Sequence, residues 1–369
     1  MSKARNLADL LDANGDVASG ALDNVPPSND ASALTTGTLP VERVPYVGRR
    51  NLIINGAMQV NQRGVTSTTS AGYCVDRFYF NTSGATATFT HESAAYGSEI
   101  NGEFDKYLKI VTTTGNNNCG FVYTVEDVKS LKTGTATLSF WAKGTNPGNG
   151  SFSSRVSRRP DGNEFDRPLN DETWTVTSSW QKFTFTFNVG SLSGASSETA
   201  ASSIYIDFLQ PPTDTTTDAW ELNITGVQLE VGSVATPFEH RSYGEELALC
   251  QRYFQQSSQA GGNPYANRYV PIFRYNSAGE WYGHQEFPVP MRSDPTMTTS
   301  TGSSGTWGMW WNGTGTASLT SGLPTCDGSR HGFHFYLTNN VSTVGYGGMT
   351  THGDGSSSYR WEWFADAEL

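Results

Sequence analysis

The chain has 369 residues, 16% of them charged, 39 glycines and a formal net charge of −11. This charge argues against proteins that bind nucleic acid through a basic face, because phosphate contacts need clustered Lys and Arg. Hydroxyl and amide groups carry most of the polarity, which favours β-sheets joined by many turns, and the length indicates two or three domains.

Residues 1–48 contain one aromatic residue, Tyr46, and cannot build a core of their own. Ala4–Ala13 has leucines at helical spacing, but about ten residues are too few for a stable isolated helix. The stretch at 21–45 is rich in Pro, Ser and Thr and is expected to be extended. We therefore expect residues 1–48 to be an arm that neighbouring chains order.

Residues 49–241 carry short apolar runs separated by turn signals. At 183–187, three Phe alternate with Thr, which is the period of a half-buried strand. Nine such runs at this spacing predict a β-sandwich. The expected strands are Asn51–Met58, Asp76–Asn81, Ala85–His91, Lys106–Thr113, Gly120–Val125, Ala136–Lys143, Gln181–Asn188, Ser203–Leu209 and Trp220–Glu230. The charge-dense run Arg155–Arg167 is expected to be a solvated loop or an ion-paired contact between subunits.

Ser242–Gln256 carries the strongest helix signals. Ser242 with Glu245 three residues on makes a capping box, and the acidic pair Glu245 and Glu246 suits the positive end of a helix. We expect residues 242–257 to form the longest helix of the chain and to link two β-domains.

Residues 258–369 are expected to form a second β-domain, with strand patterns that resume after a Gly-Gly-Asn-Pro break. The candidate strands are Tyr265–Tyr275, Glu280–Pro288, Gly308–Trp311, Gly332–Thr338 and Tyr359–Ala365.

Four cysteines, Cys74, Cys119, Cys250 and Cys326, stand far apart and form no CxxC pair, so a zinc knuckle is not expected. We expect reduced, mostly buried thiols, in keeping with a reducing cytoplasm. The N-terminus lacks the apolar core of a signal peptide, and no run approaches the about 18–20 apolar residues that span a membrane. The sequence predicts a soluble chain without membrane insertion.

Three blocks resemble phage tail-fibre proteins that carry a jelly-roll domain related to carbohydrate-binding modules. They are Arg49–Gly64 (RRNLIINGAMQVNQRG), Tyr73–Phe78 (YCVDRF) and Gly226–Phe254 (GVQLEVGSVATPFEHRSYGEELALCQRYF). The segment ASALTTGTLP at 31–40 also resembles the starts of marine-phage tail-fibre proteins, and the terminal DAEL resembles their ends, so we expect the chain to end naturally there. The resemblance implies an all-β fold: a jelly-roll β-sandwich plus a C-terminal β-sandwich-like domain, joined by one helix, behind an extended arm.

Exposed aromatic residues among small polar ones are what a glycan site needs, because sugar rings stack on aromatic faces while polar neighbours bind their hydroxyls. Trp307, Trp310 and Trp311 lie in such a Gly-, Ser- and Thr-rich segment. In the jelly roll, Trp141 shares a predicted strand face with Ser139 and Lys143 and is the best groove candidate. Each of these tryptophans has core packing as its alternative. For the jelly roll as a whole, the alternative is a domain that has lost sugar binding and serves as a spacer.

Motifs for catalysis and metal binding are absent. We find no GxSxG, Walker A, dinucleotide or HExxH pattern, and no fixed repeat of the kind that tail depolymerases have. His331 and His334 are three apart, so on a strand they face opposite sides and cannot share a metal. Asp76 and Arg77 are expected to form a buried ion pair that fixes two strands, with a calcium site as the alternative. We expect no cofactor, no metal site and no enzyme activity.

The sequence thus predicts a homotrimeric tail fibre or spike, located on a virion that is assembled in the host cytoplasm. Residues 1–48 would dock on other tail, collar or baseplate proteins, and the C-terminal domain would contact a host-surface glycan. One alternative is a purely structural adaptor, collar or head-fibre protein, and a second is a polysaccharide depolymerase.

Overall fold

The computed structural model describes residues 50–82, 86–114, 119–126, 131, 134–148, 150–159, 166–189, 203–209, 219–256, 270–274, 280–299, 307–311, 315–319, 325–338, 346–350 and 363–368. All of these residues belong to one compact unit, residues 49–369. The expected arm and the helix expected at Ala4–Ala13 lie outside the described residues.

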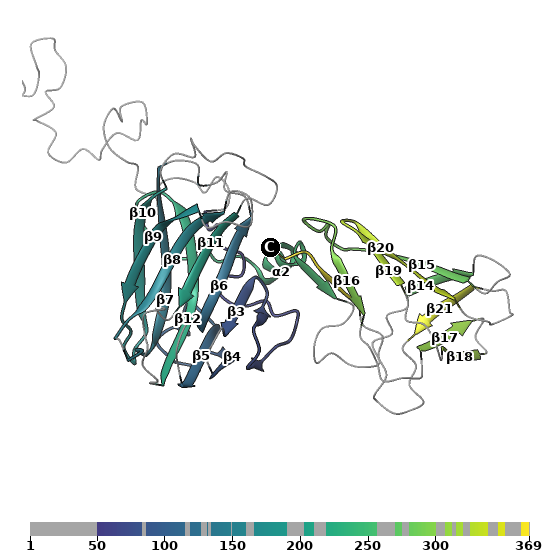
Figure 1. Ribbon diagram of the computed structural model, residues 1–369, viewed down its shortest axis with the longest axis horizontal. Coiled ribbons are helices and arrows are strands. Elements are labelled where there is room, and N and C mark those ends of the chain that lie inside the picture. The colour runs from purple at the N-terminus through teal and green to yellow at the C-terminus, as the bar shows by residue number, and fades with distance from the viewer. Residues whose placement is uncertain are drawn as a thin grey trace, which may run out of the picture. The chain divides into compact units, whose positions relative to one another are not determined.

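Two six-stranded antiparallel sheets build a β-sandwich (Figure 1). The first sheet has the strand order β1-β4-β5-β12-β7-β10, and the second has β2-β3-β6-β11-β8-β9. The chain crosses between the sheets at most steps, for example from β5 to β6, from β6 to β7 and from β10 through β11 to β12, which is the winding of a jelly roll. The predicted all-β jelly-roll fold is therefore confirmed. The strands are β1 Ser67–Thr68, β2 Gly72–Val75, β3 Phe78–Thr82, β4 Thr86–Ser93, β5 Lys106–Thr114, β6 Cys119–Glu126, β7 Thr135–Thr145, β8 Phe152–Arg159, β9 Asp166–Trp174, β10 Gln181–Asn188, β11 Ser203–Leu209 and β12 Trp220–Val231.

The core lies between the two sheets and is rich in phenylalanine. Phe121, Phe140 and Phe208 are fully buried or nearly so, and Phe140 packs edge-on to Phe208 with ring centroids 4.8 Å apart. Burial of each such ring contributes about 1.5–3 kcal/mol to stability. The alternation at 183–187 gives β10, whose Phe183 and Phe185 pack against this core from the sheet edge.

Two expectations for the sandwich are wrong. Asn51–Met58 is an irregular turn and not a strand, because Asn55 and Met58 both have left-handed backbone angles, with φ of 61° and 58°. The charge-dense run at Arg155–Arg167 is not simply a loop, since it includes the end of β8 and the start of β9, which pair antiparallel. The arginines of this run interrupt the alternation of apolar and polar residues that predicts a strand.

The linking helix is shorter than expected. The helix α2 spans Tyr243–Gln251, and Phe254–Gln256 forms strand β13 instead of helix. The physical reason is tertiary pairing, since β13 hydrogen-bonds to β22, with Phe254 opposite Asp366. The capping prediction is correct: Ser242 is the N-cap and its hydroxyl accepts from the Glu245 amide at 3.3 Å. No helix among the described residues is long and apolar enough to cross a membrane.

Beyond α2 the described chain is again β-structure. A three-stranded sheet has the order β13-β22-β16, and a seven-stranded sheet has β18-β17-β21-β14-β15-β20-β19. A small apolar cluster lies here, in which Phe333 packs on Trp363 and Phe287 with centroids 4.9 and 5.9 Å apart. The strands are β14 Val270–Arg274, β15 Glu280–Glu286, β16 Thr296–Thr299, β17 Trp307–Trp311, β18 Gly315–Leu319, β19 Thr325–Ser329, β20 Gly332–Thr338, β21 Tyr346–Thr350 and β22 Trp363–Asp366.

Arg77 joins the sandwich to the residues that follow β22. Its guanidinium is buried, pairs with Glu368 and lies 3.5 Å from the Tyr253 ring centroid. The expected Asp76–Arg77 pair is therefore wrong: Asp76 instead accepts from the backbone amide of Gln62 at 2.6 Å and from its side-chain amide at 2.7 Å. Asp76 thus binds the segment that contains Gln62, whereas Arg77 binds the residues that follow β22.

Cys74, Cys119 and Cys250 are free, buried thiols, as expected. Burial raises the pKa of Cys74 and Cys119 to about 12, so neither is a reactive thiolate at neutral pH. The side chain of Cys326 lies outside the described residues.

Candidate functional site

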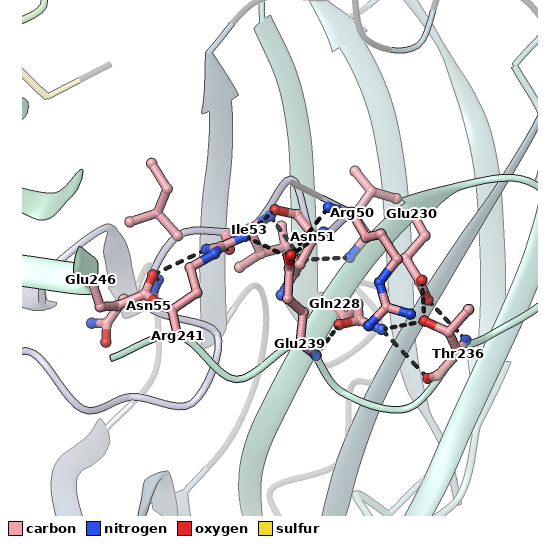
Figure 2. A network of polar contacts seen from close by, with 12 residues as sticks. Arg50, Asn51, Ile53, Asn55, Gln228, Glu230, Thr236, Glu239, Arg241 and Glu246 are labelled. Atoms are coloured by element: carbon pink, nitrogen blue, oxygen red, sulfur yellow. Dashed lines mark hydrogen bonds and ion pairs between the residues drawn. The ribbon is translucent and has the colours of Figure 1, made fainter. Parts of the chain in front are cut away.

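The first and last of the three resembled blocks meet in one buried polar cluster, shown in Figure 2, which we call the entry–exit clamp. Arg241 is its centre. The guanidinium donates to the backbone oxygens of Asn51 and Ile53, and it pairs with Glu239 and Glu246 at 3.0 and 3.2 Å. Its side chain is only 4% exposed. Because a buried cation is costly unless paired, this closed arrangement indicates a structural role.

Asn51 continues the clamp toward β12. Its side-chain oxygen accepts from the amides of Ile53 and Leu229, and its side-chain nitrogen donates to the Val227 carbonyl at 3.2 Å. The neighbouring Gly226 has φ of 62°, and a Cβ there would lie 2.5 Å from the Phe104 ring. The block therefore needs glycine at this position for both conformation and space. The first and last resembled blocks thus determine how the chain enters and leaves the sandwich.

A different set of polar groups lies on the outer face of the second sheet. Directly opposed residues of antiparallel strands share a face, so the registers define a row that crosses all six strands. The row is Tyr73, Tyr79, Val122, Asp207, Arg155 and Asp171. At about 4.8 Å between strands, it extends about 24 Å. Tyr205 and Arg159 flank it on β11 and β8, and we call these eight residues the tyrosine–arginine face.

Asp207 occupies the middle of this face and is only 3% exposed. Burial raises the pKa of its carboxyl group to about 6, against the opposing effect of the Arg155 charge, and its carboxylate accepts from the Arg155 backbone amide. A desolvated carboxylate between arginines and tyrosines, on an outer rather than a core face, is the kind of perturbed group that marks binding sites.

The aromatic rings of the face are held in place by contacts to each other and to cations. Tyr73 and Tyr79 pack edge-to-face with centroids 5.3 Å apart, and the Arg159 guanidinium lies 3.9 Å from the Tyr205 ring centroid. Tyr79, Tyr205 and both arginines are half-buried, so each presents part of its surface outward. Burial raises the pKa of Tyr205 to about 12, which keeps the phenol a neutral donor.

Chemically, this surface fits a polyhydroxylated ligand. Tyrosine rings offer apolar faces for sugar rings, and their hydroxyls and the half-buried arginines offer donors and acceptors for hydroxyl groups. The buried Asp207 carboxylate contributes indirectly, because its charge lies near those of Arg155 and Arg159. The 24 Å row is long enough to follow several sugar rings. Among the described residues, no group of three or more His, Cys, Asp or Glu side chains is arranged to hold a metal ion.

The tryptophans predicted from the sequence lie elsewhere. Trp141 is on the outer face of the first sheet, half-buried against the cluster that contains Trp180 and Phe104. Trp307, Trp310 and Trp311 all lie on β17, but their side chains are outside the described part of the structure. Their ligand contacts remain predictions, and the structure does not bring Trp141 onto the tyrosine–arginine face.

Two hollows also lie outside this face. One of about 510 Å³ is lined by Arg63, Phe254, Phe364 and Asp366 among others, and Arg63 there already pairs with Asp366 at 3.1 Å. The second, of about 250 Å³, borders Arg77 and Tyr123. The arginines of these hollows, Arg63 and Arg77, are 11% and 1% exposed, whereas Arg155 on the tyrosine–arginine face is 37% exposed. We therefore favour the tyrosine–arginine face as the candidate site.

Comparison with known proteins adds structural similarities only. No protein-family model matches the chain, and no curated protein matches it. Among solved structures, the enzymatically active domain of tailspike protein 4 from bacteriophage CBA120 is 13% identical and has a TM-score of 0.31, covering 49% of this chain and 21% of that one. The family 11 carbohydrate-binding module from Clostridium thermocellum, in complex with a mixed-linked tetrasaccharide, is 12% identical with a TM-score of 0.29, covering 47% and 92%. The CBM22-1 xylan-binding domain from Paenibacillus barcinonensis is 14% identical with a TM-score of 0.28, covering 51% and 100%.

Proposed function

We propose that the chain is a virion protein of a phage tail fibre or spike, and that it binds a host-surface glycan through the tyrosine–arginine face. The virion assignment rests on the three sequence blocks that resemble tail-fibre proteins. The glycan assignment rests on one observation, the buried Asp207 carboxylate in the middle of an outward-facing row of tyrosine and arginine.

A glycan array with the purified full-length protein tests the ligand class. Tyr79→Ala removes a stacking ring, and Asp207→Asn removes the buried charge near Arg155 and Arg159, so each should lower binding by tenfold or more, about 1.4 kcal/mol. Thr184→Ala is the matched control, since Thr184 is exposed on β10 of the other sheet. Equal binding by all four proteins, each shown to be folded by a cooperative melt, would reject the face as the glycan site.

The tryptophans of β17 are tested in a separate arm of the same experiment. If Trp310 and Trp311 contact the receptor, replacing both with Ala abolishes adsorption to host cells while the melting temperature shifts by only a few degrees. Collapse of folding instead would identify these tryptophans as core residues. Retained adsorption would favour the tyrosine–arginine face or another protein of the particle.

A purely structural adaptor, collar or head-fibre protein is the alternative that the entry–exit clamp favours, because its closed ion pairs serve only to hold the sandwich. Absence of glycan binding, together with location of the protein in the particle by electron microscopy, would support that alternative. We propose binding without catalysis, and release of reducing sugar from host polysaccharide would overturn this in favour of a depolymerase.

A further inference from the structure

Two histidines that are far apart in the sequence are neighbours in the seven-stranded sheet. The register of β15 and β20 places His284 directly opposite His334, and both side chains are exposed. Their imidazole rings lie 4.6 Å apart between centroids, with a tilt of 39°. The sequence pattern directed attention to His331 and His334, but the partner of His334 is on another strand.

This separation matches what one shared metal ion requires. Imidazole nitrogens bind Zn²⁺ at about 2.0–2.1 Å, which places the centroids of two coordinated rings about 4.5–5.2 Å apart for angles of about 90–109°. We propose that His284 and His334 form a binding site for a divalent transition-metal ion, with water completing the coordination.

The surrounding residues hold both rings at this position. Phe333, next to His334, is fully buried on the opposite face of the sheet, which directs His334 outward. Gly332 leaves room for the other ring, because a Cβ there would lie 3.2 Å from Cε1 of His284 and 2.4 Å from the Gln285 carbonyl oxygen. Glu286, exposed two residues beyond His284, adds a negative charge to the same face. Both rings therefore project from the same face of the sheet, at a separation set by the strand register.

The chemical class of the ion follows from its ligands. Neutral imidazole suits Zn²⁺, Cu²⁺ and Ni²⁺, whereas Ca²⁺ and Mg²⁺ prefer oxygen ligands. Two nitrogen ligands leave several coordination positions open, so binding should be reversible and sensitive to chelators. The proposal is independent of glycan recognition, since none of its residues belongs to the tyrosine–arginine face.

Isothermal titration calorimetry of the full-length protein, without a polyhistidine tag, tests this with Zn²⁺ alone. We expect one ion per chain and a loss of affinity of about tenfold or more in His284→Ala and in His334→Ala, because even supporting groups of a metal ligand contribute about 10–100-fold. His331→Ala is the matched control, an exposed histidine of the adjacent turn, and should bind as the parent does.

Electron paramagnetic resonance of the unaltered protein with Cu²⁺ keeps the test decisive if a variant misfolds. Hyperfine coupling to two imidazole nitrogens supports the site. A spectrum with no nitrogen coupling would overturn it, as would equal loss of Zn²⁺ binding in His331→Ala or unchanged binding in the two other variants.

Discussion

The entry–exit clamp and the tyrosine–arginine face use similar residue types in opposite ways. In the clamp, Arg241 is 4% exposed and makes hydrogen bonds or ion pairs with two carboxylates and two backbone oxygens. On the face, the ion pair between Arg155 and Asp171 is 3.7 Å long, and its side chains are 37% and 49% exposed. A closed set of partners holds a fold together, whereas half-exposed charges can still exchange water for a ligand. The exposure and the number of partners of an arginine, and not its residue type, therefore separate a structural ion pair from a candidate binding group.

The largest expected effect comes from the clamp. Arg241→Met leaves Glu239 and Glu246 with an uncompensated, mostly buried charge, which should cost about 3–5 kcal/mol of stability. Urea unfolding measures the loss. Lys109→Met is the control, because Lys109 pairs with Glu221 at the surface and such pairs contribute only about 0–1 kcal/mol. Similar losses in both variants would break the contrast between closed and open ion pairs.

The next effect has the opposite sign and comes from the face. Asp207 has a folded-state pKa of about 6, above the about 3.9 of an unfolded aspartate, so the folded protein holds its proton more tightly between these pH values. Stability contributed by this group is therefore present below about pH 4 and is lost as pH rises through 6. Asp207→Asn should be more stable than the parent by about 1–3 kcal/mol at pH 7, and the difference should vanish near pH 4.

Thermal melts across this pH range measure the effect. The pKa of the buried Asp76 is also raised to about 6, so stability changes with pH in both proteins, and only the difference between them reports on Asp207. A variant that gains stability while losing glycan binding would show that the face keeps a destabilising charge for its ligand. Loss of stability at pH 7 would instead place Asp207 among the structural groups.

The smallest expected effect concerns the helix between the two β-regions. Ser242→Ala removes the side chain that caps α2 and should cost about 0.5–2 kcal/mol, at the lower end because the cap is exposed. Ser242→Asn keeps a capping oxygen and is the control. Neither variant should alter glycan binding, so a binding change here would link the helix to the face.

Much of the fold followed from local signals. The alternation at 183–187 and the capping box at Ser242 act within a few residues, so they can be read from the sequence. Strands β8 and β9 were missed because Arg155 and Arg159 face outward while the polar Ser154 and Arg158 interrupt the inner face, which removes the apolar period. The irregular Asn51–Met58 segment was missed for the opposite reason: its apolar residues are buried by a turn and not by a strand.

The candidate site was not predictable in the same way. Tyr79, Asp207 and Arg155 become neighbours only through the pairing of β3, β6, β11 and β8, and no local pattern encodes that register. The sequence instead favoured Trp141, whose Ser and Lys neighbours suggested a groove. The structure packs it against Trp180 and its cluster.

The partners of Arg63 and Arg77 have a consequence for biosynthesis. Both arginines pair with Glu368, which is synthesised 305 and 291 residues after them. At about 5–20 residues per second, a ribosome needs about 15–60 s to deliver that carboxylate. During this interval the nascent sandwich carries two cations without this counter-charge, because the contacts of Arg63 and Arg77 with Glu368 form only once residue 368 has been synthesised. If the sandwich folds on the ribosome, its contacts with Glu368 are therefore among the last to form.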